Sequence, residues 1–399
     1  MGDFMTVRLG LLLSVSALAL ASPVLAQQEA RDDVFGLGQI IVLGSRIGSP
    51  TVGGAVVARE QMWRFEKLNL EQAVNLAPGV NSQFDSNGRR NESDIFVRGF
   101  GRWQVPLLID GVRIYLPADN RLDFSRFLTG DVGEIQIQKG YASVIDGAGA
   151  MGGLINLVSR KPTQPFEFKA QAGLNFGDGT EVQGWNAYGM AGTRQEKHYV
   201  AGSISYFDKD FWTLSNDYTP TATSMQQRRQ RINADSRDWR GNIKAGFTPN
   251  DTEEYTINYT RQEGEKGGLL NVYNNPQVPP NSFWRWPQWD VQSVSALSNT
   301  AIGGASYLKT KFYYNVMENA LYAYDDITYT TQSANGRFIS PYSDESYVTS
   351  IEGGTDALAQ NSLKVAFHYR WDKHSECIDN RPTSPARNTE PVQRQGQHS

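Results

Sequence analysis

From about residue 166 onwards, the chain alternates apolar and polar side chains with a period of two. Leu363, Val365 and Phe367, for example, alternate with Lys364 and His368. One apolar and one polar face on each segment predicts half-buried β-strands rather than helices. We expect nine strands, near residues 166–176, 180–192, 197–207, 237–247, 253–262, 292–300, 305–325, 347–358 and 362–374.

The connections between these strands are alternately short and long after the first hairpin. The short ones are at 193–196, 248–252, 301–304 and 359–361, and the long polar ones are at 208–236, 263–291 and 326–346. In an up-and-down meander this alternation places every long loop on one side of the sheet. Short periplasmic turns and long external loops are typical of outer-membrane β-barrels. A soluble β-sandwich shares the alternation along its strands but has no reason to keep this loop asymmetry.

The two faces of the sheet would meet different surroundings in these two architectures. In a barrel the apolar face meets lipid, and Lys309, Lys311, His368 and Arg370 would face an aqueous lumen. In a sandwich the same four side chains would face bulk water. The loop asymmetry and the export signal described next favour the barrel.

Residues 1–26 have the organisation of a secretory signal peptide. Arg8 precedes a short apolar segment from Leu9 to Ala21, and small residues lead to a cleavage point after Ala26. The apolar segment is too short to cross a bilayer, and a buried N-terminal helix is the alternative. Export predicts that the mature protein acts outside the cytoplasm. Since Cys377 is the only cysteine, a disulfide within the chain is excluded.

Residues 27–49 form a polar, glycine-containing segment around one short β-prone stretch. This stretch comprises Gln39, Ile40, Ile41, Val42 and Leu43. It can add as an extra strand to the sheet edge of another protein, where main-chain hydrogen bonds supply the affinity. An ordinary first strand of the following domain is the alternative.

Residues 50–163 combine a helix with short strands and predict a compact α+β domain. Asn69 is a helix cap with Gln72 as its capping-box partner, and Pro78-Gly79 ends the helix. Asp110-Gly111 predicts a type I′ hairpin turn, because both central residues of such a turn need positive φ. The expected strands are 94–97, 105–109, 112–115, 134–138 and 154–158.

The same domain carries motifs whose order and spacing resemble those of TonB-dependent outer-membrane receptors. They are Arg98-Gly99-Phe100, residues 106–113 (PLLIDGVR), residues 131–140 (DVGEIQIQKG) and residues 147–162 (GAGAMGGLINLVSRKP). The motif residues are Arg98, Gly99, Asp110, Gly111, Glu134, Lys139, Gly140, Gly147, Gly149, Gly152 and Gly153. Residues 39–43 are similar to the TonB box of the family.

The resemblance implies an antiparallel membrane β-barrel of roughly 22 strands with an N-terminal α+β plug domain, residues 50–163. Residues 164–399 would be the N-terminal part of the barrel. It implies a receptor in the bacterial outer membrane, in contact with lipid, that takes up a ferric siderophore or similar chelate with energy from TonB. It implies no enzyme activity and no cofactor. Uptake of haem, cobalamin or oligosaccharide is an alternative, and so is a surface adhesin or structural envelope protein.

The chain is short for such a barrel. After residue 165 there remain 399 − 165 = 234 residues, which the nine expected strands use. A barrel of roughly 22 strands needs more than twice that number of strands. We therefore expect an incomplete barrel, a fragment not competent alone, with a polar tail from about residue 375 and an unpaired edge at the ninth strand.

Two groups of residues are candidate ligand contacts. The first group lies between the expected plug strands and comprises Arg89, Arg90, Trp103, Tyr115 and Arg121. Guanidinium groups suit the carboxylates of a ferric chelate, and solvated loop arginines are the alternative. The second group is Trp284 and Trp286 at the end of a long loop, for which an aromatic girdle at the membrane interface is the alternative.

Other kinds of site are disfavoured. Gly147 to Gly152 fits G-x-G-x-x-G, but a dinucleotide site needs a helix after it, and Leu154 to Val158 is β-prone. The four histidines are scattered, so we expect no metal site, and no catalytic arrangement stands out. A net charge of −4 predicts no broad basic surface for nucleic acid.

Overall fold

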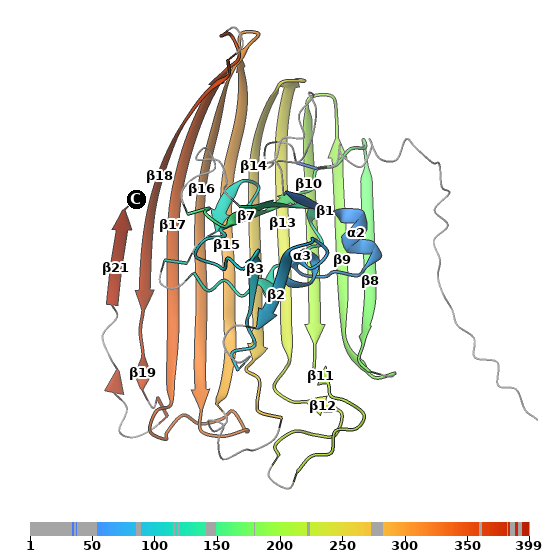
Figure 1. Ribbon diagram of the computed structural model, residues 1–399, viewed down its shortest axis with the longest axis vertical. Helices are drawn as coiled ribbons and strands as arrows, with labels where there is room; N and C mark the ends of the chain where they lie inside the picture. The colour runs from blue at the N-terminus through green and yellow to red at the C-terminus, as the bar shows by residue number, and fades with distance from the viewer. Residues whose placement is uncertain are drawn as a thin grey trace, which may run out of the picture.

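The computed structural model consists of one large sheet and a smaller domain that lies against one face of it (Figure 1). The structure describes residues 34–35, 37, 54–84, 89–114, 116–117, 120–140, 149–178, 180–221, 224–272, 282–358, 361–380, 382–383, 388–389 and 393–398. The predicted signal peptide, residues 1–26, and the predicted TonB box, residues 39–43, lie outside the described residues. In the part of the chain that is described, no helix is long and apolar enough to cross a membrane.

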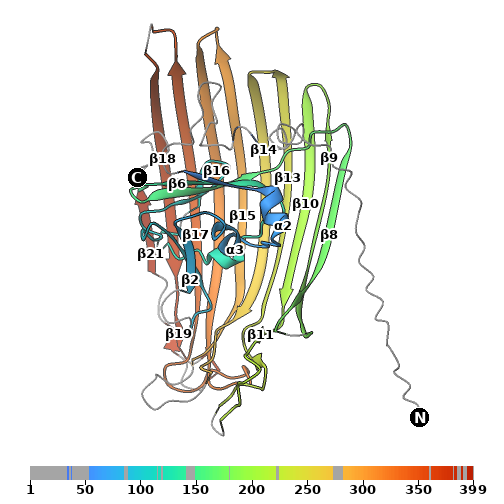
Figure 2. The ribbon, with the colours of Figure 1, turned by 45° about the vertical axis from the view of Figure 1, so that its right-hand side comes forward.

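The large sheet is an antiparallel meander in which nine long strands each pair with the next one along the chain (Figure 2). All nine expected strands are therefore present. They are β8 (Glu167–Phe176), β9 (Val182–Arg194), β10 (His198–Lys209), β13 (Ser236–Asn250), β14 (Glu253–Gly267), β15 (Phe283–Ile302), β16 (Ser306–Tyr324), β17 (Phe338–Thr355) and β18 (Leu363–Glu376). The short strands β11 (Trp212–Thr213) and β12 (Gln230–Arg231) pair within the first long connection.

Two strand starts differ from the prediction. β15 begins at Phe283 instead of 292, and β17 begins at Phe338 instead of 347, so both preceding loops are shorter than expected. In β15 the pairing register shifts between Arg285 and Gln288, and such an irregularity breaks the alternation from which a strand is predicted.

The end of the chain corrects a second expectation. The polar tail contains β19 (Asp379–Asn380), β20 (Asn388–Thr389) and β21 (Gln393–His398), and β21 pairs with β18 from Trp371 to Glu376. The ninth strand is thus partly covered. Backbone pairing needs no apolar side chain, so a polar segment such as this gives no alternation signal. Among the described strands, none joins β8 to the opposite edge, and the barrel is open.

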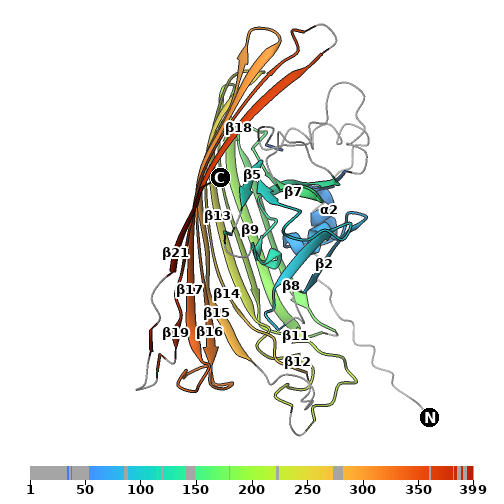
Figure 3. The same cartoon turned by 60° about the vertical axis from the view of Figure 1, so that its left-hand side comes forward.

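The two faces of the large sheet differ in polarity, as the sequence predicts. The face away from the smaller domain exposes many large apolar side chains, among them Phe168, Ile204, Ile243, Ile257 and Phe367. The other face meets the smaller domain, where Lys311 donates a hydrogen bond to the carbonyl of Gly111 at 3.2 Å. Figure 3 shows from the edge of the sheet that the smaller domain lies wholly on this second face.

The smaller domain, the plug, is built on the mixed sheet β1-β6-β7-β4-β5 with short helices packed on it. Its elements are β1 (Ala55–Ala58), α2 (Arg59–Arg64), α3 (Leu70–Val74), β2 (Val80–Phe84), β3 (Ser93–Val97), β4 (Leu107–Ile109), β5 (Val112–Ile114), the 3₁₀ helix η2 (Phe124–Arg126), β6 (Val132–Lys139) and β7 (Gly153–Ser159). Asn69 caps α3 as predicted, accepting from the Gln72 N–H at 3.0 Å. The Gln72 side chain accepts from Leu68 N–H instead of Asn69 N–H.

The plug shares its hydrophobic core with the large sheet. Leu70, Ile135 and Ile155 belong to one buried cluster with Trp289 of β15 and Met317 of β16. Since the wall of the large sheet supplies part of this core, the plug is stabilised by the wall as well as by its own packing.

Candidate functional site

Among the described residues, four buried ion pairs join the plug to β13 and β14 of the wall. Lys244 pairs with Asp110 at 3.2 Å, Arg240 with Asp131 at 3.0 Å, Arg126 with Asp238 at 2.7 Å, and Lys266 with Asp123. Each pair joins one plug residue to one residue of β13 or β14. Removing one partner of such a pair leaves an uncompensated buried charge, which typically costs about 3–5 kcal/mol.

Asp110 acts both as a turn residue and as an ionic partner. Asp110 and Gly111 have φ of 51° and 72°, which confirms the predicted positive φ of the hairpin turn between β4 and β5. The turn directs the Asp110 carboxylate back onto β7, where it accepts from the Ser159 N–H at 2.8 Å and hydroxyl at 2.6 Å. Lys244 donates a further hydrogen bond to the Oδ2 atom of this carboxylate.

The other described motif residues shape the turns of the plug. Arg98 and Gly99 form an exposed turn of positive φ, Gly140 and Gly149 also have positive φ, and Lys139 ends β6. Glu134 lies buried in β6 and accepts a hydrogen bond from Gln136 at 2.7 Å. Gly147 lies outside the described residues. These residues set the backbone conformation of the plug turns, and the contacts described for them lie within the plug.

Strands β6 and β7 approach each other so closely at Gly153 that only glycine fits there. Its φ is 129°, and a Cβ atom there would lie 2.1 Å from the carbonyl oxygen of Gln138. The glycine run Gly147 to Gly152 is followed by strand β7, and a dinucleotide site needs a helix in that place. The structure therefore does not support the dinucleotide interpretation.

Five of the seven candidate ligand residues lie in one cluster, which we call the arginine–tryptophan cluster. The Arg89 guanidinium lies 4.5 Å from the ring centroid of Trp284, and that of Arg90 lies 5.4 Å from Trp286. Arg121 joins them through Glu92, whose carboxylate is 2.8 Å from Arg90 and 3.7 Å from Arg121. The cluster lies where β15 begins, at the end of the sheet that carries the long connections.

The two remaining candidates are placed differently. Trp103 lies in a plug turn and is 52% exposed, whereas Tyr115 is outside the described residues. Trp284 and Trp286 face the plug, and Trp286 is only 1% exposed, so the aromatic-girdle interpretation is wrong for this pair. The register shift between Arg285 and Gln288 explains this. It lets Trp284, Trp286 and Trp289 share the inner face.

Glu92 is the counter-charge of the arginine–tryptophan cluster. It is 4% exposed, and burial raises the pKa of its carboxyl, while Lys266 and Arg90 act in the opposite direction. Among the described residues, this cluster brings three guanidinium groups together around the Glu92 carboxylate. Such a surface, with aromatic rings beneath it, suits an anion.

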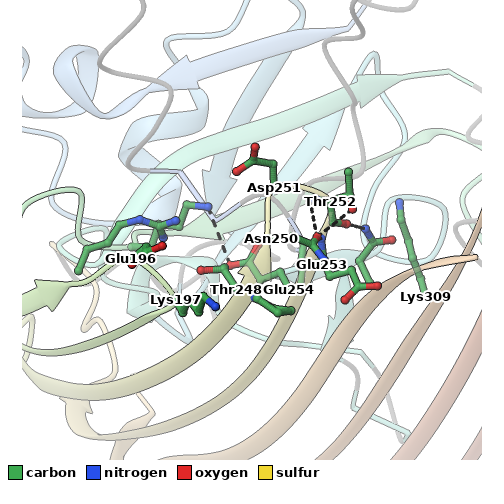
Figure 4. A pocket seen from close by; sticks show the side chains of 14 residues that line it. Glu196, Lys197, Thr248, Asn250, Asp251, Thr252, Glu253, Glu254 and Lys309 are labelled. Carbon is green, nitrogen blue, oxygen red and sulfur yellow. Dashed lines mark hydrogen bonds and ion pairs between the residues drawn. The ribbon is translucent and has the colours of Figure 1, made fainter. Parts of the chain in front are cut away.

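A hollow lies at the end of the sheet opposite the arginine–tryptophan cluster, beside the short turns (Figure 4). It has a volume of about 480 Å³ and is lined by the 248–254 turn, Lys161, Lys309 and Leu37. Asn250 closes its own turn by accepting from the N–H groups of Thr252 and Glu253. Its lining mixes cations with carboxylates, so it has no net preference for one sign of charge. No group of three or more metal-ligating side chains occurs within the described ranges.

Residues 51–154 match the family model of the TonB-dependent Receptor Plug Domain. Among curated proteins, the chain is 25% identical over 179 residues to the vitamin B12 transporter BtuB of Vibrio vulnificus, covering 43% of this chain and 28% of that protein. It is 23% identical over 293 residues to the ferric enterobactin receptor of Pseudomonas aeruginosa, covering 68% and 38%. The chain thus spans well under half of the length of both relatives.

Solved structures show the same fold. The unliganded ferric citrate transporter FecA matches with a TM-score of 0.67 and 15% identity, covering 86% of this chain and 52% of that one. The copper transporter OprC matches with a TM-score of 0.65 and 13% identity, covering 88% and 52%. The match extends over both the plug and the large sheet, since it covers most of the chain.

Proposed function

Since this chain belongs to the TonB-dependent receptors of the bacterial outer membrane, we propose that it takes up a small anionic metal chelate, a ferric siderophore first of all. The energy would come from TonB, acting on residues 39–43. The apolar outer face of the sheet would contact membrane lipid. No step requires a catalytic group or a cofactor.

The arginine–tryptophan cluster is the observation that supports an anionic ligand. Arg89, Arg90 and Arg121 offer forked donors that match carboxylate or catecholate oxygens. Trp284 and Trp286 hold two of these guanidinium groups by cation–π contact. Because these guanidinium groups are already held in place, less side-chain entropy is lost when a ligand binds to them.

Relatives of the chain include a cobalamin transporter and a copper transporter as well as siderophore receptors. The three guanidinium groups of the cluster favour a chelate with acidic groups over an uncharged ligand such as an oligosaccharide. An adhesin or structural envelope protein would use neither this cluster nor a coupling peptide. Energy-dependent uptake separates transport from those alternatives.

The test is a binding titration of ferric chelates of different charge with the receptor in membranes. The double variant R89A/R90A should weaken binding of the anionic chelate by roughly 100-fold, because two charge-assisted contacts are lost. Arg261→Ala is the matched control, since Arg261 lies in β14 next to β15 but pairs with Glu263 on the outer face. Equal affinity of R89A/R90A and the unmodified receptor would reject the cluster as the ligand site.

A further inference from the structure

A short N-terminal segment, described at Val34, Phe35 and Leu37, is packed between the plug and the wall. Val34 forms an antiparallel bridge with Arg160, and the Phe35 N–H donates to the carbonyl of Ser159 at 3.0 Å. Phe35 is fully buried, in a cluster with Val158 of β7 and Leu297 of β15. We call these residues the N-terminal anchor. It ends two residues before the predicted TonB box at 39–43.

Phe35 covers one of the four buried ion pairs. The Lys244 ammonium lies 3.6 Å from the centroid of the Phe35 ring, and its other contacts are Asp110 and the Ser159 hydroxyl. The side chains of Lys244 and Asp110 are 1% and 3% exposed. The same backbone unit, Ser159, therefore binds the N-terminal anchor through its carbonyl and Asp110 through its N–H.

We infer that Phe35 is a positioning residue that keeps water away from the Lys244–Asp110 pair, and that a pull on residues 39–43 removes it before the plug itself opens. The source of the pull rests on the proposed function. The cover of the ion pair by Phe35 does not depend on it.

The contacts of the N-terminal anchor explain why it should leave first. Among the described residues, one bridge and one main-chain hydrogen bond hold the anchor, whereas β1, which follows residues 39–43 in the chain, pairs with β6 at four positions. Of the main-chain bonds that the structure describes, fewer must break to extract the anchor than to extract β1. Local opening of this kind begins in the parts of a fold with the fewest stabilising contacts.

Departure of the N-terminal anchor would open a path for water. Leu37 packs against the Phe35 cluster on one side and lines the 480 Å³ hollow on the other. Without the anchor, the hollow would extend towards Lys244. The attraction between Lys244 and Asp110 falls steeply once water raises the local dielectric constant. The ionic contact nearest to the short turns would then weaken first, while Arg126–Asp238 and Lys266–Asp123 still hold the opposite end of the plug.

The test measures amide hydrogen exchange of Ser159, whose N–H is bonded to the Asp110 carboxylate. In Phe35→Ala, this amide should exchange at least about tenfold faster, since a desolvated cation–π contact is worth more than a decade in an equilibrium constant. Val34→Ala is the matched control, because Val34 lies in the same segment and cluster. It should raise exchange of the Ser159 amide clearly less than Phe35→Ala does, because it removes buried methyl groups but leaves the contact between Phe35 and Lys244 in place. Unchanged protection in Phe35→Ala would overturn the inference.

The same substitution in a variant that lacks the ion pair distinguishes the proposed role of Phe35 from a general folding defect. In the double variant K244M/D110N the ion pair is absent, so adding Phe35→Ala should produce no further increase at Ser159. An undiminished increase would show that Phe35 acts by packing alone, and would overturn the inference.

The order of release is tested by adding the C-terminal domain of TonB to the unmodified receptor. The Phe35 amide should lose protection before the amides of β1 do, and simultaneous or reversed loss would overturn the proposed order. A complete absence of any response to TonB would instead reject the proposed function. The Phe35→Ala result would still decide whether Phe35 covers the ion pair.

Discussion

Arg126 and Asp238 illustrate how single residues hold the plug in the wall. Their side chains are 1% and 2% exposed and lie 2.7 Å apart. Asp238→Leu should destabilise the assembled receptor by about 3–5 kcal/mol, since it leaves Arg126 charged and buried. The double variant R126M/D238L should recover most of this loss, because no charge is then unpaired. Thermal unfolding in detergent measures both, and a double variant as unstable as the single one would contradict the explanation.

Glu92 gives the arginine–tryptophan cluster a pH dependence. Burial raises the pKa of the Glu92 carboxyl above its usual 4.5, so this group becomes neutral at a higher pH than an exposed glutamate. As pH falls through this raised pKa, the cluster loses the negative charge of Glu92. Binding of an anionic chelate should therefore tighten, by several-fold for one removed charge. Affinity measured from pH 7 down to the usual pKa checks this direction.

Glu92→Gln is the variant that isolates this effect. It should bind the anionic chelate more tightly at neutral pH and lose the tightening on acidification. The same raised pKa acts on folding in the same direction as on binding. A carboxyl that holds its proton more strongly in the folded state makes the fold less stable as pH rises from 4.5 through the raised pKa. A Glu92→Gln receptor with an unaltered affinity profile would exclude Glu92 as the counter-charge.

Residue-scale prediction from sequence succeeded where the cause is local. The Asp110-Gly111 turn could be predicted from two adjacent residues, and the Asn69 cap from a segment of four residues. The partners of Asp110 were not predictable. Lys244 is 134 positions further along the chain, and only the packing of plug against wall brings the two together. The pairing of Arg89 with Trp284 was equally hidden, because it depends on the register shift in β15.

At the scale of elements, the outer face of the strands carries its own prediction. Ile243 of β13 is 59% exposed on the face away from the plug, where we propose lipid. Ile243→Lys should cost about 2–4 kcal/mol in a bilayer if this position lies near its midplane. Asp290→Lys is the control, since Asp290 lies on the same face nearer the long connections. Refolding into lipid vesicles measures both, and equal stability of the two variants would argue against lipid contact at Ile243.

The elements also show which signals a sequence carries. Strands with one apolar face were predicted because every second side chain reports burial, and all nine are present. Their ends were less predictable. β15 extends past an irregularity in register, and β21 pairs through its backbone with side chains that are almost all polar. The alternation of apolar and polar residues reflects the surroundings of the side chains. Strand pairing uses the backbone and can continue into segments that do not alternate.

For the whole molecule, plug and wall form one structural unit that needs a supply of work to open. Trp289, Val291 and Met317 of the wall complete the core of the plug, and four buried ion pairs bind the rest of the interface. Under the proposed function, this work would come from an outside partner, and residues 39–43 are the proposed point of engagement.

Ile41→Pro tests this dependence. Strand addition to a partner uses main-chain hydrogen bonds, and proline at Ile41 removes one donor and fixes φ. Energised uptake of a labelled ferric chelate should fall to background. Binding of the same chelate to de-energised cells should be unchanged, because the arginine–tryptophan cluster lies at the end of the plug away from the N-terminal anchor. Ile41→Val, which keeps both the donor and the β-branched side chain, should transport normally. Normal uptake by Ile41→Pro would remove residues 39–43 as the coupling site, and transport would then have to be driven through another part of the chain.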